Sequence, residues 1–427
     1  MKIDIFWFRR DLRLTDNRGL FDALKRSNPV LPIFIFDKNI LEELPEYDAR
    51  VSFIHDQLDS IDKALKEKGS GLLIKHGNPL EVWKGLVAEY EIEEAYFSRD
   101  YEPYARDRDK EIYEFLKSQN IVMKGHKDQV VFERDEVVKP DGKPYTVYTP
   151  YKRKWLEHFS QSDIENHPSE ELSNYWQGSF DFPSLEELGF KRSQIQVKDF
   201  HLNDLENYGN TRDFPDQDTT SYLSPHLRFG TVSPRQIIRQ LGQGTEVFLS
   251  ELIWREFFMQ ILFHFPHVLG QSFRPQYDKI EWRNDEQEFE KWKDGQTGFP
   301  MVDAGMRQLN ETGYMHNRVR MVVASFLCKD LLIDWRWGEA YFAEKLLDYD
   351  LSANNGNWQW AAGTGCDAAP YFRIFNPNEQ LKKFDPNFQY VKRWVSEYGT
   401  SEYPEPMVDR KMTRERALSA YQKAVKA

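Results

Sequence analysis

The first 126 residues alternate between two kinds of segment, and this alternation constrains the fold more than any other feature. Short apolar runs rich in Ile and Phe recur as KIDIFWF, PVLPIFIF, GLLIKH, EEAYFS and NIVMKGH. Between them lie stretches with helical spacing, such as residues 48–69, in which Asp48 is a candidate cap and Gly69 a candidate end. Strands that alternate with helices in this way form a parallel sheet covered by helices. We therefore predict a doubly wound α/β domain at the N-terminus.

The strand signals disappear from about residue 200 onward. Segments such as EVFLSELIWREFFMQILFHF and PMVDAGMRQLNETG have helical spacing, and RKMTRERALSAYQKAVKA ends the chain as a charged helix. The polar stretch before them is irregular, and we interpret it as a connector that packs over the surface. The predicted parts are an α/β domain over residues 1–130, a connector over residues 131–200 and an all-α domain over residues 201–427.

Composition limits the class of protein. The 57 basic and 69 acidic residues give a net charge of −12, so DNA binding would require a local basic face. Only Cys328 and Cys366 are present, which rules out a four-cysteine metal site in this chain. The N-terminus is charged too early for a signal peptide, and no apolar run reaches about 18 residues. We expect an intracellular, cytoplasmic monomer in a reducing compartment, with no membrane span and no metal.

Two stretches carry groups that suit a phosphate or a ring-bearing ligand. TTSYLSPHLRFGTVSP, from Thr219, places four Ser and Thr hydroxyls around a predicted helix start, where free amides bind phosphate. Helix N-capping alone explains the same residues. ELIWREFF places Glu251, Trp254, Arg255 and Phe258 on one helical face. Such a face can line a polar cavity, or it can be an amphipathic surface with a Glu–Arg pair.

Two further stretches lie closer to the C-terminus. MHNRVRM contains two arginines and is also typical of a solvated helix face. LLDYDLSANNGNWQW carries Asp348 and Asp350, whose carboxylates can bind metal, transfer protons or accept hydrogen bonds from a ligand. No His lies close by in the sequence, which argues against metal. Because Asn and Gly disfavour helices, we expect residues 354–357 to bend the chain and turn Trp358 and Trp360 toward different partners.

Tryptophan is concentrated in the second half of the chain. Eight of the twelve tryptophans lie after residue 250, which suits a domain that binds a flat molecule or transfers electrons. A large aromatic core explains the excess equally well. Trp282, Trp335 and Trp358 lie on three separate segments, and their indoles can relay electrons if folding brings them into line.

Together these motifs resemble the photolyase/cryptochrome family, and most closely the class I photolyases that repair cyclobutane pyrimidine dimers. The resemblance runs from FWFRRDLRLTDNRGL through RDFPDQDTTSYLS, ELIWREFF and MHNRVRM to LLDYDLSANNGNWQWAAGTGCDAAPYFRIFNP, and so covers nearly the whole chain. It implies FAD in the all-α domain, and light-driven electron transfer from excited reduced FAD to a dimer flipped out of UV-damaged DNA.

The resemblance also implies which residues bind the cofactor. The diphosphate would be held by Tyr208, Thr220, Ser221, Leu223 and Ser224, together with the neighbouring Tyr222. The flavin and ribose would be surrounded by Arg255, Asn317, Arg320, Asp348, Tyr349 and Asp350, with Asn354 beside the flavin N5. Electrons for photoreduction would pass along Trp282, Trp335 and Trp358.

The same resemblance assigns residues to the damaged DNA. The dimer would be bound by Glu251, Trp254, Phe258, Asn317, Arg318, Met321 and Trp360. Of these, Glu251, Trp254 and Trp360 would act in catalysis together with Asn354. Backbone phosphates would contact Arg318, Arg373 and Lys383, and more weakly Lys152, Arg153 and Lys154.

Several residues favour dimer repair over other branches of the family. Six-four photolyases carry two histidines where this chain has Asn317 and Met321, and the iron–sulfur branch needs four cysteines. Plant-type cryptochromes usually have Asp at the position of Asn354 and lose the Trp at the position of Trp254. A blue-light sensor without repair activity is the alternative. A second, light-harvesting chromophore is also implied, and YEPYARDRD favours a deazaflavin over a folate or a flavin.

Overall fold

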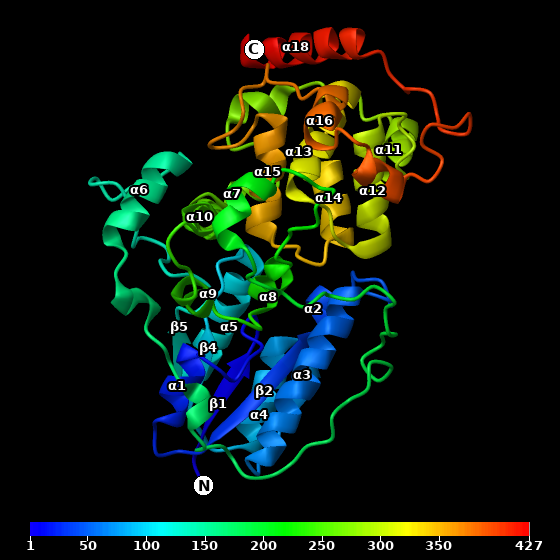
Figure 1. Cartoon of the computed structure of the whole chain (residues 1–427). Coiled ribbons are helices and arrows are strands. Elements are labelled where there is room, and N and C mark those ends of the chain that lie inside the picture. Colours follow the sequence, from blue (N-terminus) through cyan, green and yellow to red (C-terminus); the bar gives the residue numbers. More distant parts are fainter. Residues whose placement is uncertain (427) are drawn as a thin grey trace. The chain divides into compact units, whose positions relative to one another are not determined.

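The structure, a computed structural model, describes residues 1–426 and divides into two compact units (Figure 1). Unit 1 comprises Met1–Val137, Lys154–Phe200 and Tyr222–Leu241, and unit 2 comprises Val138–Arg153, His201–Ser221 and Gly242–Ala427. These bounds differ from the predicted domains, because the stretch predicted as a connector is divided between both units. Residues 222–241, predicted to lie in the all-α domain, belong to unit 1.

Unit 1 is built on a parallel sheet with the strand order β3-β2-β1-β4-β5 (Figure 1). Each of the five predicted apolar runs forms one strand. The strands are β1 (Ile3–Phe8), β2 (Val30–Asp37), β3 (Leu73–Gly77), β4 (Ile92–Ser98) and β5 (Val122–His126). This sheet and the mostly helical remainder of the chain confirm the predicted fold class.

Side chains of β1 and β2 enter two separate cores, one on each face of the sheet. Phe6 and Phe8 pack in one core, and Ile5 and Trp7 pack in the other. Because successive side chains of a strand point to opposite faces, a strand buried on both faces must be apolar throughout. This requirement explains why the strands appear in the sequence as continuous apolar runs.

Helices cover the sheet and begin where the sequence indicates. The helices of unit 1 are α1 (Arg18–Leu24), α2 (Lys38–Leu41), α3 (Ala49–Glu67), α4 (Pro79–Glu89), α5 (Pro103–Ser118), α8 (Leu223–Phe229) and α9 (Pro234–Arg239), with short 3-10 helices at Gln161–Ile164 and Ser169–Glu171. The predicted cap of α3 is confirmed, because the Asp48 carboxylate accepts hydrogen bonds from the amides of Arg50 and Val51. Gly69, just beyond this helix, has a φ of 78°.

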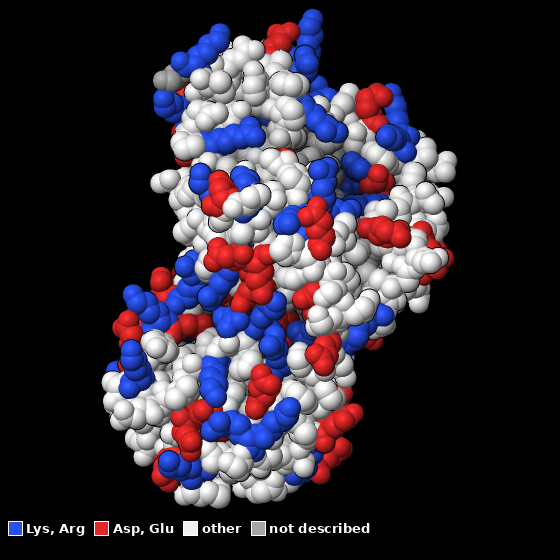
Figure 2. Space-filling view, turned by 90° about the vertical axis from the view of Figure 1, so that its left-hand side faces the viewer, with Lys and Arg blue, Asp and Glu red and all other residues white. Residues whose placement is uncertain are grey.

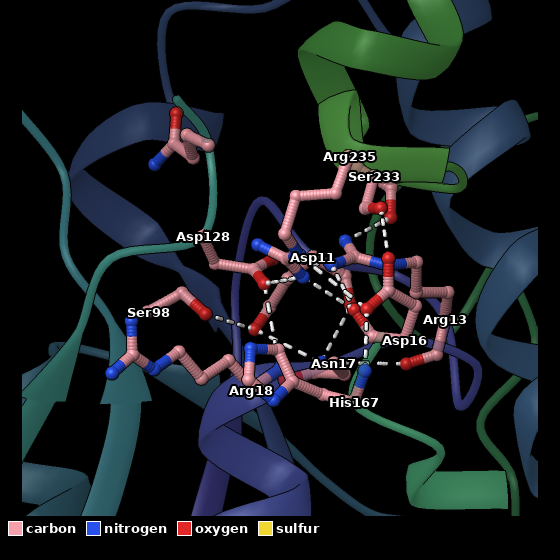
Figure 3. Close-up of polar contacts among 12 residues, drawn as sticks. Asp11, Arg13, Asp16, Asn17, Arg18, Ser98, Asp128, His167, Ser233 and Arg235 are labelled. Carbon is pink, nitrogen blue, oxygen red and sulfur yellow. Dashed lines mark hydrogen bonds and ion pairs between the residues drawn. The ribbon is translucent and has the colours of Figure 1, made fainter. Parts of the chain in front are cut away.

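A buried network of charged side chains attaches the segment with α8 and α9 to the rest of unit 1 (Figure 3). This polar cluster contains Asp11, Arg13, Asp16, Asn17, Asp128, Ser233 and Arg235. Asp128 accepts hydrogen bonds from Arg13 and, at 2.8 Å, from Arg235. Asp16 accepts one from Ser233, which caps the N-terminus of α9. These contacts explain why a segment distant in sequence belongs to unit 1.

The backbone of this segment also lies against the loop that follows β1. Leu12 donates its amide to the Phe229 carbonyl at 3.0 Å, and Arg13 donates to the Gly230 carbonyl at 3.0 Å. A Cβ on Gly230 would lie 2.0 Å from the Arg10 carbonyl oxygen, and its φ is 67°. Only glycine fits this position.

Unit 2 is helical. Its α-helices are α7 (Tyr208–Thr211), α10 (Glu246–His264), α11 (Glu286–Lys293), α12 (Pro300–Thr312), α13 (Asn317–Ser325), α14 (Trp335–Lys345), α15 (Leu351–Ala362), α16 (Pro377–Phe384), α17 (Gln389–Trp394) and α18 (Arg410–Lys426). A π-helix (Phe326–Leu331) follows α13, and short 3-10 helices lie at Leu205–Asn207, Pro266–Leu269 and Pro275–Lys279. Helix α6 (Tyr148–His158) begins in unit 2 and ends in unit 1. Among residues 1–426, none of the helices has the length and apolar character that crossing a membrane requires.

Candidate functional site

A small cavity in unit 2 brings together aromatic residues from two helices. Trp254 and Phe258 of α10 and Trp360 of α15 line it, together with Gly356 and residues 365–368. Phe258 stacks against Trp254, with ring centroids 5.4 Å apart. The structure thus joins the aromatic residues of two motifs about a hundred residues apart around one small space of about 10 Å³.

Glu251 lies on the same face of α10 and forms an ion pair with Arg212. Arg212 also lies over the ring of Tyr208, with its guanidinium carbon 5.3 Å from the centroid. Burial disfavours the charged form of Arg212, but the Glu251 carboxylate stabilises that form. The pKa of the guanidinium is therefore raised. Sequence reasoning did not identify Arg212, although the residue opens the RDFPDQD motif.

The two arginines of α13 contact carboxylates rather than forming only a solvated face. Arg318 donates to Asp213 at 2.8 Å, and Arg320 donates to Asp348 at 3.0 Å. Asn317, at the first position of α13, is exposed, and Met321 is half-buried. The contact between Arg320 and Asp348 joins two predicted cofactor residues from different segments.

The segment 354–357 does not bend, so this prediction from the sequence is wrong. Residues Leu351–Ala362 form one continuous helix, α15, which Asp350 caps by accepting from the amides of Ser352 and Ala353. Contacts from elsewhere outweigh the low helix propensity of Asn and Gly. Asn355 donates to the Val268 carbonyl at 2.9 Å. A Cβ on Gly356 would lie 2.1 Å from the ring of Phe258, so glycine permits this close packing.

Asn354 is buried on α15, and α14 fixes the orientation of its amide. Its Nδ2 donates to the Glu339 carboxylate at 2.8 Å and to the Glu339 carbonyl at 3.1 Å. Burial raises the pKa of the Glu339 carboxyl. With the nitrogen occupied, the amide oxygen is left to accept a hydrogen bond from a ligand. No sequence spacing indicated Glu339, which lies fifteen residues before its partner.

The three tryptophans of the predicted relay differ in their surroundings. Trp358 is 2% exposed and packs its ring edge-on to Phe342, with centroids 4.9 Å apart. Trp335 is buried at the start of α14, and its indole nitrogen lacks a partner among residues 1–426. Trp282 is half-buried and lies edge-on to Tyr421 at 6.0 Å. Electron transfer along the three indoles therefore stays a prediction.

The predicted diphosphate residues are distributed over both units. Tyr208, Thr220 and Ser221 belong to unit 2, and Tyr222, Leu223 and Ser224 belong to unit 1. The predicted helix start is confirmed, since α8 begins at Leu223. Burial raises the pKa of the Tyr208 hydroxyl to about 12. Tyr349 packs against the core of unit 2, and Arg255 is half-buried on α10.

The predicted phosphate contacts differ in their availability. Arg373 and Lys383 are exposed, and each cation lies over a neighbouring Phe ring. Arg153 is exposed and Lys152 half-buried in unit 2, whereas Lys154 pairs with Glu157 in unit 1. On the face drawn in Figure 2, basic and acidic side chains are interspersed. On this face, DNA would therefore meet individual cations rather than one uniformly basic surface.

Comparison with known proteins identifies the family. Residues 4–172 match the family model described as DNA photolyase, and residues 248–401 match the FAD binding domain of DNA photolyase. The deoxyribodipyrimidine photo-lyase of Escherichia coli is 38% identical, over 100% of both chains.

Solved structures agree with this result. A bacterial class III photolyase from Agrobacterium tumefaciens superposes with a TM-score of 0.90 at 35% identity, covering 100% of this chain and 98% of that one. An archaeal photolyase from Sulfolobus tokodaii with two FAD molecules gives 0.85 at 36% identity, covering 99% and 100%. Since both the sequence and the fold match over their full length, this chain belongs to the DNA photolyase family.

Proposed function

We propose that the protein is a deoxyribodipyrimidine photo-lyase, which uses FAD and blue light to split cyclobutane pyrimidine dimers in UV-damaged DNA. The observation that carries this proposal is that Trp254 and Trp360, two of the residues expected to contact the dimer, line one cavity. It acts as a monomer on DNA inside the cell.

The residues of unit 2 have the chemistry that FAD requires. The Asn354 amide is held by Glu339 so that its oxygen is left to accept a hydrogen bond, as the N5–H of a reduced flavin would donate. Arg320 and Asp348, both assigned to the cofactor by the motif resemblance, form an ion pair at 3.0 Å. Bound FAD would supply the chemistry of the reaction: the light-excited reduced flavin would lend the dimer one electron, and that electron would return to the flavin once the two carbon–carbon bonds have split.

The protein supplies binding and orientation for the damaged bases. A dimer stacks poorly in the duplex, so flipping it out costs less than flipping an intact pair. Trp254 and Trp360 then provide aromatic surfaces for the two pyrimidines, and each stacked base contributes about 1–3 kcal/mol. Glu251 accepts hydrogen bonds from the pyrimidine N–H groups or, with Arg212 as a donor beside it, binds the polar edge of the dimer.

Exposed cations hold the DNA backbone. Arg373 and Lys383 are exposed and contact phosphates, while Arg318 remains paired with Asp213 until a phosphate competes for it. Phosphate contacts release counterions, so the affinity for DNA falls as salt is raised. Replacing Arg373 and Lys383 by Ala should lower the salt slope by about one unit for each cation that is removed.

The test is light-dependent repair of a thymine-dimer oligonucleotide by purified protein with bound, reduced FAD. Illumination with blue light should restore the intact thymines, and the same sample kept in the dark should not. A Trp360→Ala variant that keeps its FAD should repair poorly because one stacking surface is lost. Retained FAD with no light-dependent repair would refute the proposal and favour a blue-light sensor.

We also propose that unit 1 binds a second, light-harvesting chromophore. A cavity of about 290 Å³ lies beside β4 and β5, and its lining is rich in cations: Phe97, Arg99, Asp100, Arg106, Asp109, Lys110, Tyr113, Met123 and Arg134. Ligands of doubly wound sheets bind at the carboxyl ends of the strands, and cations favour an anionic ring compound such as a deazaflavin. The absorption spectrum and the flavin content of the purified protein identify the compound, and one FAD per chain with no other chromophore contradicts the proposal.

A further inference from the structure

Tyr148 lies flat against the indole of Trp254, one of the two aromatic surfaces assigned to the dimer. The ring centroids are 3.6 Å apart, and the planes differ by 9°. The Tyr148 side chain is buried, with 7% of its surface exposed. This is the closest stacking described for Trp254, whose other ring neighbours are Phe257 and Phe258 at 5.6 and 5.4 Å.

Polar contacts with two residues, Ser250 and Asp367, fix Tyr148 in this position. Its hydroxyl donates to the Ser250 carbonyl at 2.6 Å, on the turn of α10 that precedes Trp254. Its backbone amide donates to the Asp367 carboxylate at 2.9 Å. Tyr148 is the first residue of α6, where an amide has no partner within the helix, so the carboxylate satisfies a group that would otherwise be unpaired.

Tyr148 therefore connects two parts of the cavity lining. Trp254 comes from α10, and Asp367 comes from the loop beyond α15, and both line the same cavity. An indole attached only through its own helix can change rotamer, and stacking a base on it then requires ordering the ring. If the indole is already fixed in one orientation, less conformational entropy is lost when a base stacks on it, so binding is more favourable.

We propose that Tyr148 is a positioning residue for lesion recognition. Resting on the proposed function, the inference is that Tyr148 holds the Trp254 indole in the orientation that stacks on the flipped-out pyrimidine. It acts through Trp254 and does not itself contact the dimer. Losing the Tyr148 ring weakens binding of damaged DNA and leaves binding of intact DNA unchanged, because phosphate contacts carry the latter.

The experiment compares affinities for a fluorescent thymine-dimer oligonucleotide and its undamaged counterpart, measured in the dark with the FAD-loaded protein. Tyr148→Leu should reduce the preference for the dimer roughly 3- to 10-fold, the range that the loss of an aromatic pair represents. Tyr148→Phe, which keeps the ring, should retain most of the preference. Tyr151→Leu is the matched control, since Tyr151 is also buried on α6 and packs on Phe257 at 5.3 Å.

A double-mutant cycle separates a positioning role from general destabilisation. In a Trp254→Leu background, Tyr148→Leu should cause no further loss of dimer preference, because the residue that it positions is gone. A full additional loss in that background would overturn the inference. So would tighter dimer binding by Tyr148→Leu, which would show that the tyrosine occupies the place of a pyrimidine.

The outcomes also distinguish this inference from the proposed function. Wild-type protein with no preference for the dimer refutes both, whereas a preference that Tyr148→Leu leaves intact refutes only the role of Tyr148. If Tyr148→Leu does not retain FAD, the same cycle is run with Tyr148→Phe, whose ring has lost its hydrogen bond to Ser250. The smaller loss of dimer preference caused by Tyr148→Phe must also disappear in the Trp254→Leu background. If that loss persists there, the inference is overturned.

Discussion

Replacing Asp128 by Asn tests whether the polar cluster stabilises unit 1. The Asp128 side chain is 1% exposed and lies between two buried guanidinium groups, those of Arg13 and Arg235. The variant keeps the size of the side chain and one hydrogen-bond acceptor but removes the negative charge. The two arginines then lose the carboxylate that neutralises both of them. Buried charges without a counter-charge destabilise the folded state strongly.

The structure gives the expected magnitude. The two arginines overcome burial and lower the pKa of Asp128 from 3.8 to about 2. A difference of nearly two pKa units corresponds to about 2 kcal/mol of stability. Because the pKa is lower in the folded state, this contribution is present above pH 4 and is lost as the pH falls toward 2. Breaking a buried ion pair typically costs about 3–5 kcal/mol, so we expect Asp128→Asn to lose about 2–5 kcal/mol at pH 7.

The assay is urea-induced unfolding at pH 7, with hydrogen–deuterium exchange of peptides from β1 and α9 to locate the change. Asp56→Asn is the control, since Asp56 pairs with Arg192 on the same unit while both side chains are 52% exposed. That exposed pair should contribute no more than about 1 kcal/mol. If Asp128→Asn costs as little as the control, or if exchange increases equally throughout both units, the reasoning about the cluster is wrong.

Three further predictions concern unit 2. Burial lowers the pKa of Lys329 to about 7, so the folded protein binds fewer protons than the unfolded chain between pH 7 and 10. Over this range the free energy of unfolding of the wild type, measured with urea, should rise relative to that of Lys329→Met by about 1 kcal/mol per pH unit. A stability difference between the two proteins that stays constant with pH would contradict this. Gly338→Ala should destabilise by about 1–3 kcal/mol, because the new Cβ lies 2.1 Å from the Trp358 ring, and an unchanged melting temperature would refute the clash. Trp358→Phe should slow light-driven flavin reduction, followed by absorbance, yet leave repair by chemically reduced protein intact; unchanged photoreduction would exclude Trp358 from the relay.

The architecture of the N-terminal unit could be predicted because its pattern is local. Each strand is short, apolar throughout and separated from the next by a helix, so length and periodicity identify it without tertiary information. The boundary of the unit could not be predicted in the same way. Residues 222–241 have helical spacing like the segments after them, and only tertiary contacts, such as the ion pairs of Arg235 with Asp16 and Asp128, assign them to unit 1.

The candidate site was predictable in its residue types and less so in its geometry. Motif resemblance identified Trp254 and Trp360, and the structure places both at one cavity. Two residues that contact predicted site residues, Tyr148 beside Trp254 and Glu339 beside Asn354, were missed. Tyr148 and Glu339 act on partners 106 and 15 residues away, and no spacing in the sequence encodes such a contact. The chemistry of a ligand limits which residue types can contact it, so such residues form recognisable motifs. A supporting residue needs only to reach its partner in the fold, so many residue types at many positions can serve.

Helix α15 shows how a straight helix serves two partners without the bend expected from its composition. An α-helix turns by about 100° per residue, so side chains four apart share a face and side chains two apart point in nearly opposite directions. Asn354 and Trp358 therefore share one face, where they meet Glu339 and Gly338 of α14. Gly356 and Trp360 share the other, where Gly356 meets Phe258 and both border the cavity. Helical periodicity alone separates the residue expected at the flavin from the residue expected at the dimer, and the unusual composition serves close packing on both faces.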